Sequence, residues 1–245
     1  MCGIVGYIGI ENSKEAVLNG LRKLEYRGYD SAGIAIYNKD NGLKLFKDKG
    51  RVAHLEEIIE EGFDGPVSIG HTRWATHGKP NKLNSHPHVS NSGRFTIVHN
   101  GVIDNYKEIM FTKLSNYTLY SDTDTEVIVN LIERYSKKYS VESSIRITAT
   151  KLEGSYSCLI MDKETPDRLY ILKNKTPLLI GFGENSTIIA SDVIPLIGYA
   201  HTYTSLCDHT FGVLTKDAVK LTDYLGNPIK YVTKELVMDD QDISL

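Results

Sequence analysis

The order of the predicted elements places this sequence in the α+β fold class, with strands and helices packed in layers. Strand-like runs come first, helical periodicity dominates residues 104–152, and a series of strand-like runs fills residues 156–214. A hydrophobic content of 41% over 245 residues is enough for an ordinary buried core, in one large domain or two small ones.

A buried strand followed by a helix is predicted at the start of the chain. Residues 3–8 are apolar and bounded by glycine, which is typical of a short buried strand. Asn12 with Glu15 three residues later resembles a capping box that opens a helix. The apolar stripe of that helix consists of Val17, Leu18, Leu21 and Leu24.

A hairpin is predicted next, because Asn41 and Gly42 form a strong turn signal between strand-like residues 33–37 and 43–47. The elements that follow are a short helix over residues 52–61 and strands over residues 67–71 and 95–99. A long stretch rich in Gly, Pro, His and Asn separates these last two strands and has no clear periodicity. Such a stretch inside a compact domain is usually functional.

The second half of the chain is predicted to form helices and then strands. Helical spacing covers residues 104–114, 124–135 and 141–152. The strand-like runs are residues 156–161, 168–172, 178–182, 187–190, 202–206 and 211–214. The closing residues 219–245 have a turn-forming and acidic composition, which is typical of a linker.

Charge and composition exclude several function classes. The net charge is −3 without a basic stripe, so we expect neither a nucleic-acid partner nor an anionic membrane surface. No apolar run approaches the ~20 residues that span a bilayer, and the start does not resemble a signal peptide. Three scattered cysteines do not make a disulfide framework, which agrees with a reducing compartment. We therefore expect a cytoplasmic protein.

A cysteine directly behind the initiator methionine is the most informative feature of the chain. Once Met1 is removed, Cys2 carries both a thiol and an α-amino group with a reference pKa of about 7.7 to 8.0. One residue would then supply nucleophile and base, which is the activation that a cysteine nucleophile requires. The alternative is an accidental early cysteine without a catalytic role.

A cysteine that attacks an amide also needs donors for the oxyanion, and Asn100 and Gly101 are candidates for them. They follow the predicted strand at residues 95–99, where an asparagine amide and a glycine backbone N–H could converge on one oxygen. The alternative is a tight turn, since Asn-Gly is a preferred turn pair.

Two charged residues are candidates for binding the ends of an amino acid. The planar guanidinium of Arg73 suits a carboxylate, and the carboxylate of Asp124 suits an α-ammonium group. Asp124 could instead be a helix N-cap. A nucleophile, oxyanion donors, a cation and an anion together fit a substrate with both amino-acid charges and a reactive amide, which describes glutamine.

Four histidines close together in the sequence raise the alternative of a zinc site. The segment lacks cysteine and has no HExxH-type helix, and we therefore expect no metal. These histidines are His71, His77, His86 and His88.

Six separated motifs in this order resemble the glutaminase domain of glutamine–fructose-6-phosphate aminotransferases, which are class II glutamine amidotransferases. The resemblance covers most of the chain, and the Arg-Trp-Ala-Thr-His-Gly segment distinguishes this branch from the phosphoribosyl-pyrophosphate amidotransferases. The motifs are Met-Cys-Gly-Ile-Val-Gly at the start, residues 24–33, 70–78, 85–88, 98–101 and 123–126.

The resemblance implies an N-terminal-nucleophile hydrolase fold, a four-layer αββα sandwich of two antiparallel sheets between helical layers. It implies that Cys2 forms a thioester with glutamine, that Asn100 and Gly101 hold the oxyanion, and that Arg27 supports the nucleophile. The implied glutamine-binding residues are Arg73, Trp74, Thr76, His77, His86 and Asp124. No metal or organic cofactor is implied.

The resemblance also implies a larger enzyme. Residues 2–222 would form the glutaminase domain, and residues 223–245 a tail or linker toward an absent sugar-phosphate isomerase domain. That domain would bind fructose 6-phosphate and use the ammonia to make glucosamine 6-phosphate for hexosamine synthesis, within a homo-oligomer. The alternatives are a free-standing glutaminase subunit serving a separate synthase, and a glutamine-binding module that is inactive without its partner domain.

Overall fold

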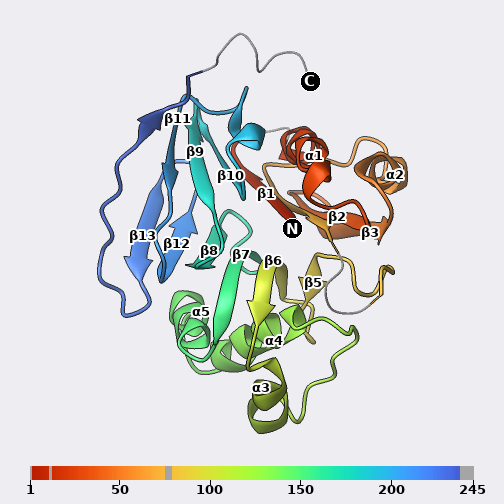
Figure 1. Cartoon of the computed structure of the whole chain (residues 1–245), viewed down its shortest axis with the longest axis vertical. Coiled ribbons are helices and arrows are strands. Elements are labelled where there is room, and N and C mark those ends of the chain that lie inside the picture. Colours follow the sequence, from red (N-terminus) through yellow and green to blue (C-terminus); the bar gives the residue numbers. More distant parts are fainter. Residues whose placement is uncertain (1, 11–12, 75–78, 238–245) are drawn as a thin grey trace.

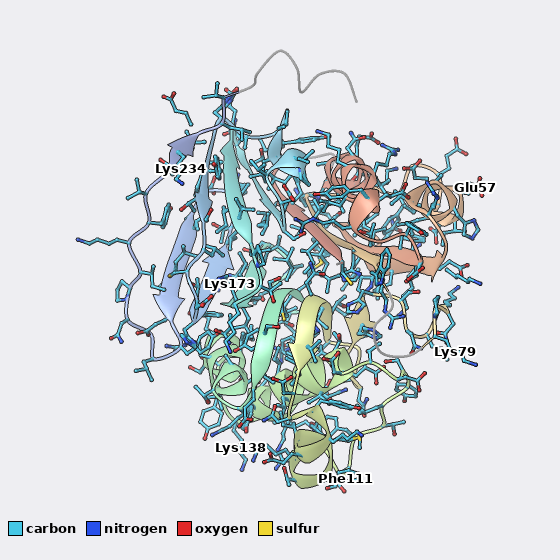
Figure 2. The ribbon with its side chains drawn as sticks, viewed as in Figure 1. Glu57, Lys79, Phe111, Lys138, Lys173 and Lys234 are labelled. Carbon is cyan, nitrogen blue, oxygen red and sulfur yellow. The ribbon has the colours of Figure 1, made fainter. Side chains whose placement is uncertain are left out.

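The computed structural model describes residues 2–10, 13–74 and 79–237. Two antiparallel sheets pack face to face, and helices cover the outer face of each sheet (Figure 1). Side chains fill the space between the layers (Figure 2). The predicted α+β class and the αββα layering implied by the resemblance are both confirmed.

The larger sheet has eight strands, with β1 (Gly3–Ile8) between β4 (Val67–Arg73) and β10 (Ser186–Ala190). Both neighbours are antiparallel to β1, so the first strand is hydrogen-bonded along both of its edges. The sheet is completed by β2 (Ser31–Asn38), β3 (Gly42–Lys49), β9 (Leu179–Gly183), β11 (Thr202–Ser205) and β14 (Lys234–Glu235).

The continuous apolar run of β1 follows from burial on both faces. Successive side chains of a strand point to opposite faces of the sheet. Ile4 and Ile8 therefore pack in the core between the two sheets, and Val5 packs against α1 (Ser13–Lys23). The second helix on this outer face is α2 (Val52–Ile58).

The smaller sheet has six strands and is covered by three helices that share a third apolar core. Its longest pairing joins β6 to β7 over nine residues, from Phe95 opposite Asp162 to Ile103 opposite Gly154. Its strands are β5 (His88–Val89), β6 (Phe95–Ile103), β7 (Gly154–Asp162), β8 (Leu169–Asn174), β12 (Thr210–Leu214) and β13 (Val219–Asp223). The helices are α3 (Tyr106–Lys113), α4 (Thr125–Ser136) and α5 (Val141–Ala149).

The turn alternative for Asn100 and Gly101 is wrong, because both residues lie inside β6. They pair with Ser157 and Tyr156 of β7. Gly101 has a φ of +124°, and a Cβ atom there would lie 1.9 Å from the Ser155 carbonyl oxygen. Pairing with β7 overrides the local turn preference, and only glycine fits this position.

Other local predictions differ at their edges. The helix predicted over residues 52–61 ends at Ile58, because Ile59 adopts an extended conformation. The capping residue Asn12 lies outside the described residues. Two short 3-10 helices, Glu25–Arg27 and Ile194–Leu196, were not predicted. None of the described helices has the length and apolar character needed to cross a membrane.

The expected tail remains on the fold as far as the structure describes it. Residues 219–223 form β13, Ile229 packs against the core between the sheets, and β14 pairs with β11. Leu236 packs against the core beneath α1. A linker-like composition did not reveal these contacts because their partners are remote in the sequence.

Leu159→Ala tests the core between the sheets. Leu159 is fully buried, and its Cδ1 atom occupies the space above Gly6 of β1. We expect the substitution to lower the free energy of unfolding by about 2–5 kcal/mol in urea denaturation, since it leaves a cavity. Leu225→Ala, at a side chain that is 81% exposed, is the matched control and should change it by less than ~0.5 kcal/mol. A loss below ~1 kcal/mol for Leu159→Ala would contradict a rigid core here.

Candidate active site around Cys2

Cys2 immediately precedes β1 of the larger sheet and contacts Asn100 of β6 in the smaller sheet. Its Sγ atom accepts a hydrogen bond from the Trp74 backbone N–H at 3.3 Å. Burial raises the pKa of the thiol, and the Trp74 N–H and the charge of Arg73 oppose that rise. The thiol therefore needs a proton acceptor before it can act as a nucleophile.

A glycine lets the backbone approach Cys2. A Cβ atom on Gly28 would lie 2.7 Å from both the Trp74 nitrogen and the Arg73 carbonyl carbon. Two residues later, the Asp30 N–H donates to the Arg73 carbonyl oxygen at 3.0 Å. The segment after the first 3-10 helix thus fixes the backbone that donates to the thiol.

Arg27 stabilises the strand that carries Cys2. Its guanidinium forms an ion pair with Asp192 at 2.5 Å and donates to the Ser191 carbonyl oxygen at 3.3 Å. Ser191 in turn exchanges hydrogen bonds with the Ile4 backbone, through its hydroxyl and its own N–H. Ser191 and Asp192 were not predicted, because nothing local shows that the end of β10 lies beside the start of β1.

Asn100 reaches Cys2 from the opposite sheet. Its side-chain Nδ2 donates to the Cys2 carbonyl oxygen at 3.0 Å, and its Oδ1 lies 3.0 Å from Nε2 of His71. The side chains of Asn100 and His71 are buried. The structure therefore brings one predicted oxyanion donor, Asn100, into contact with the residue that bears the predicted nucleophile.

Arg73 and Asp124 are both buried, the first at the end of β4 and the second just before α4. Burial lowers the pKa of Arg73, and the nearby Cys2 and the acidic Asp30, Asp124 and Asp122 counter that shift. Asp124 stands at the N-cap position of α4, yet its carboxylate does not cap the helix and accepts instead from the Ile103 N–H at 2.7 Å. Asp124 is therefore the N-cap residue by position, as the alternative expected, but its carboxylate makes no capping hydrogen bond and is held beside the end of β6.

Four histidines form a buried cluster behind Asn100. The rings of His71 and His86 stack with centroids 4.0 Å apart, and His86 meets the edge of His88 at 4.7 Å. Burial lowers the pKa of His71 to about 3 and that of His88 to about 4, and it also lowers those of His86 and His99. The predicted residue His86 thus joins the site through its stack on His71, and these rings are neutral at pH 7.

Trp74 is exposed, with 47% of its surface accessible, and its ring and that of Tyr29 meet edge to face with centroids 6.1 Å apart. Thr76 and His77 lie outside the described residues. Within the described ranges, no group of three or more acidic, histidine or cysteine residues is arranged to hold a metal ion.

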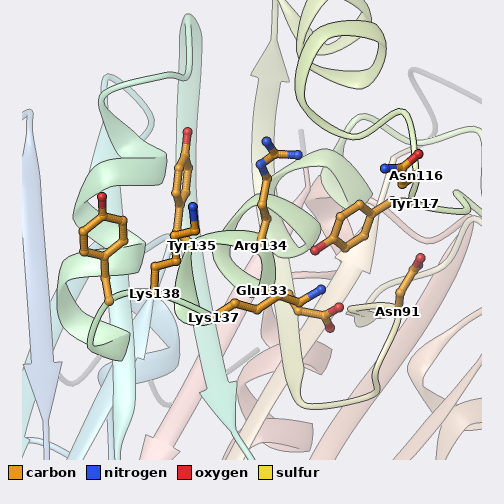
Figure 3. A pocket seen from close by; sticks show the side chains of 9 residues that line it. Asn91, Asn116, Tyr117, Glu133, Arg134, Tyr135, Lys137 and Lys138 are labelled. Atoms are coloured by element: carbon orange, nitrogen blue, oxygen red, sulfur yellow. The ribbon is translucent and has the colours of Figure 1, made fainter.

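The cavity in Figure 3 is separate from this site. It has a volume of about 580 Å³ and surrounds the C-terminal half of α4. None of the predicted site residues that the structure describes lines it. The lining residues are Asn91, Asn116, Tyr117, Glu133, Arg134, Tyr135, Lys137, Lys138 and Tyr139.

Comparisons with known proteins agree with this geometry. Residues 71–197, more than half of the chain, match the protein family described as glutamine amidotransferase domain. A glutamine–fructose-6-phosphate aminotransferase (isomerizing) of Staphylococcus aureus strain Mu50 is 51% identical over 94% of this chain. Its counterpart in Halalkalibacterium halodurans is 47% identical over 99% of this chain. The chain spans 38% and 40% of the length of these two relatives.

Solved structures show the same fold. The glutamine phosphoribosylpyrophosphate amidotransferase of B. subtilis, complexed with ADP and GMP, superposes with a TM-score of 0.80 at 23% identity. The match covers 93% of this chain and 50% of that one. This likeness shows that the two chains share the layered fold.

The buried histidines should make stability fall with acidification. Unfolded histidine titrates near pH 6.5, whereas the folded rings resist protonation, so the unfolded state binds more protons below that pH. We expect the free energy of unfolding in urea to decrease steadily from pH 7.5 to pH 5. His88→Gln should weaken this dependence, and His209→Gln, at an exposed site, should preserve it. Equal stability at both pH values would contradict the neutral cluster.

Proposed function

Because the chain belongs to the glutamine amidotransferase domain family, we propose that it hydrolyses the side-chain amide of L-glutamine to glutamate and ammonia. The observation that carries the proposal is the meeting of Cys2 and Asn100 across the two sheets. The family supplies the substrate class, and the contacts of these two residues support a nucleophile with an adjacent amide donor.

In the proposed mechanism, removal of Met1 frees the α-amino group of Cys2, which takes the proton of the thiol. The thiolate attacks the amide carbon of glutamine, and the Asn100 amide and the Gly101 N–H bind the oxygen that becomes negative. The α-ammonium group then returns its proton to the leaving nitrogen, and the carbon–nitrogen bond breaks. Ammonia and a thioester result. Water, deprotonated by the same amine, hydrolyses the thioester to glutamate and regenerates Cys2.

Substrate recognition in this proposal uses two buried charges. The guanidinium of Arg73 binds the α-carboxylate, and the carboxylate of Asp124 binds the α-ammonium group. Both lie in surroundings that exclude much of the water, which strengthens charge interactions with a bound ligand. The Ile103 N–H already holds one oxygen of Asp124, so that its carboxylate is oriented before glutamine arrives. Trp74, Thr76, His77 and His86 complete the proposed pocket.

The destination of the ammonia is proposed from the relatives, of which this chain spans less than half. The name of these relatives indicates amino transfer to fructose 6-phosphate with isomerisation. We infer that this chain is the glutaminase part of such an enzyme, a cytoplasmic homo-oligomer in which residues 223–245 lead to the isomerase domain and the product is glucosamine 6-phosphate. A free-standing glutaminase that serves a separate synthase is the alternative.

Cys2→Ala tests the nucleophile. We expect glutamate release from glutamine to fall below detection, because no thioester can form. Intact mass measured on the same sample should show that Met1 is absent, and an unchanged circular dichroism spectrum should show that the fold is kept. Continued glutamate release by Cys2→Ala would refute the proposal, and binding without turnover by Met1-free wild-type protein would favour a binding module.

Asp124→Asn tests recognition of the α-ammonium group. The amide can still accept from Ile103, but it lacks the charge that pairs with the ligand. We expect kcat/KM for L-glutamine to fall by about 10- to 100-fold, equivalent to about 1.4–2.8 kcal/mol. Glutaramate, which lacks the amino group, is the matched control substrate, and its kcat/KM should be unaffected. An equal loss for both substrates would show that Asp124 acts in another way.

A further inference from the structure

His71 and Asn100 connect the two sheets through one ring nitrogen. His71 belongs to β4 of the larger sheet and Asn100 to β6 of the smaller one. Nε2 of His71 lies 3.0 Å from the His99 carbonyl oxygen and 3.0 Å from Oδ1 of Asn100. A backbone carbonyl can only accept a hydrogen bond, so Nε2 must carry the proton of the neutral ring.

This proton determines which way the Asn100 amide faces. The amide atom nearest Nε2 must be an acceptor, which places the oxygen there and the NH2 group at the opposite end. At that end Nδ2 donates to the Cys2 carbonyl oxygen at 3.0 Å. The reversed amide would point its NH2 group at the ring N–H and its oxygen at a carbonyl, which are two repulsive contacts.

We propose that His71 is a positioning residue that fixes the Asn100 amide with its N–H donor directed at the N-terminal cysteine. This inference rests on the proposed function, in which that donor binds the oxyanion. A reversed amide would present a lone pair to the developing negative charge, so the orientation set by His71 acts on the transition state.

The surroundings of His71 hold its ring in this tautomer. The side chain is 1% exposed, and its ring lies nearly parallel to His86, with 16° between the planes. Nδ1 is buried and has no hydrogen-bond partner among the described residues. An unprotonated Nδ1 leaves no buried donor unsatisfied, whereas the other tautomer would bury an N–H without an acceptor and remove the donor from Nε2.

The backbone that carries the stacked ring of His86 is itself held from outside. Lys47 extends its Nζ to the carbonyl oxygens of Ser85 at 2.7 Å and Pro87 at 2.9 Å. On the other side, a Cβ atom at Gly33 would lie 2.0 Å from the His86 carbonyl oxygen, so β2 approaches this loop as closely as glycine permits. The rotation of His71 is therefore restricted by a chain of contacts that begins on β2 and β3.

The first test reads the tautomer without any assay of activity. Two-dimensional ¹H–¹⁵N spectra of the histidine rings, assigned with His71→Gln, should show His71 protonated at Nε2 and unprotonated at Nδ1 at pH 7. Protonation at Nδ1 alone would overturn the inference, whether or not the chain hydrolyses glutamine.

The second test is a double-mutant cycle on glutamate release. His71→Leu should lower kcat by about 10- to 100-fold and change KM by less than about threefold, because the groups proposed to bind the α-substituents are untouched. His71→Gln can supply an N–H near the position of Nε2 and should restore kcat to within about fivefold of wild type. Added to Asn100→Ala, His71→Leu should lower kcat by less than about twofold further, since the two residues act as one unit.

His88→Leu is the matched control for loss of a buried histidine. It removes a neighbouring ring whose Nε2 pairs with Thr123 rather than Asn100. It should lower the melting temperature about as much as His71→Leu, with kcat within about threefold of wild type. Equal losses of kcat in both leucine variants, or additive losses with Asn100→Ala, would reduce His71 to a structural role. Inactive wild-type protein with an Nε2–H tautomer would contradict the proposed function and leave the positioning supported.

Discussion

The pairing of β1 on both edges is the constraint on which the site depends. An N-terminal strand usually frays, but here β4 and β10 hold it along its length, and Ser191 bonds the first residues of the strand as well. Cys2 has no freedom to move away from the end of β6, because the residue that follows it belongs to the centre of a sheet. The position of the proposed nucleophile is therefore set by β-sheet hydrogen bonding rather than by a loop.

The same arrangement explains why so many polar groups are buried near Cys2. The buried groups in this part of the fold include neutral histidines, an arginine and an aspartate, where apolar side chains would otherwise be expected. A buried polar group is tolerated when it is hydrogen-bonded, and a buried charge when it has a partner. The His71–Asn100 contact meets the first of these criteria, because both groups are neutral and hydrogen-bonded, and it links the sheets at the point where the chemistry is proposed.

The sequence predicted the strands and helices more reliably than it predicted which of them contact one another. Apolar periodicity identified the strands and helices, and the motifs singled out Cys2, Arg73 and Asn100, which the fold brings near one another. It could not show that Asn100 lies within a strand, that Ser191 holds β1, or that β14 joins the larger sheet. Each of these depends on a partner that is remote in the chain, and local propensity carries no information about such partners.

The two halves of the proposed reaction, hydrolysis of glutamine and use of the ammonia, depend on different parts of the protein. Cys2 is contacted by Trp74 and Asn100, which lie 72 and 98 positions further along the chain. The proposed nucleophile is therefore placed only when both sheets have formed. The proposed binding charges, Arg73 and Asp124, are likewise buried by elements of this chain alone. The proposed hydrolysis of glutamine thus draws its nucleophile, its oxyanion donor and its binding charges from this chain, whereas the proposed use of the ammonia needs the remainder of a longer enzyme such as the relatives. This division follows from where the contacts lie. The proposed glutamine site is built from the two-sheet sandwich, and the compound that accepts the ammonia is proposed to bind to another part of the enzyme.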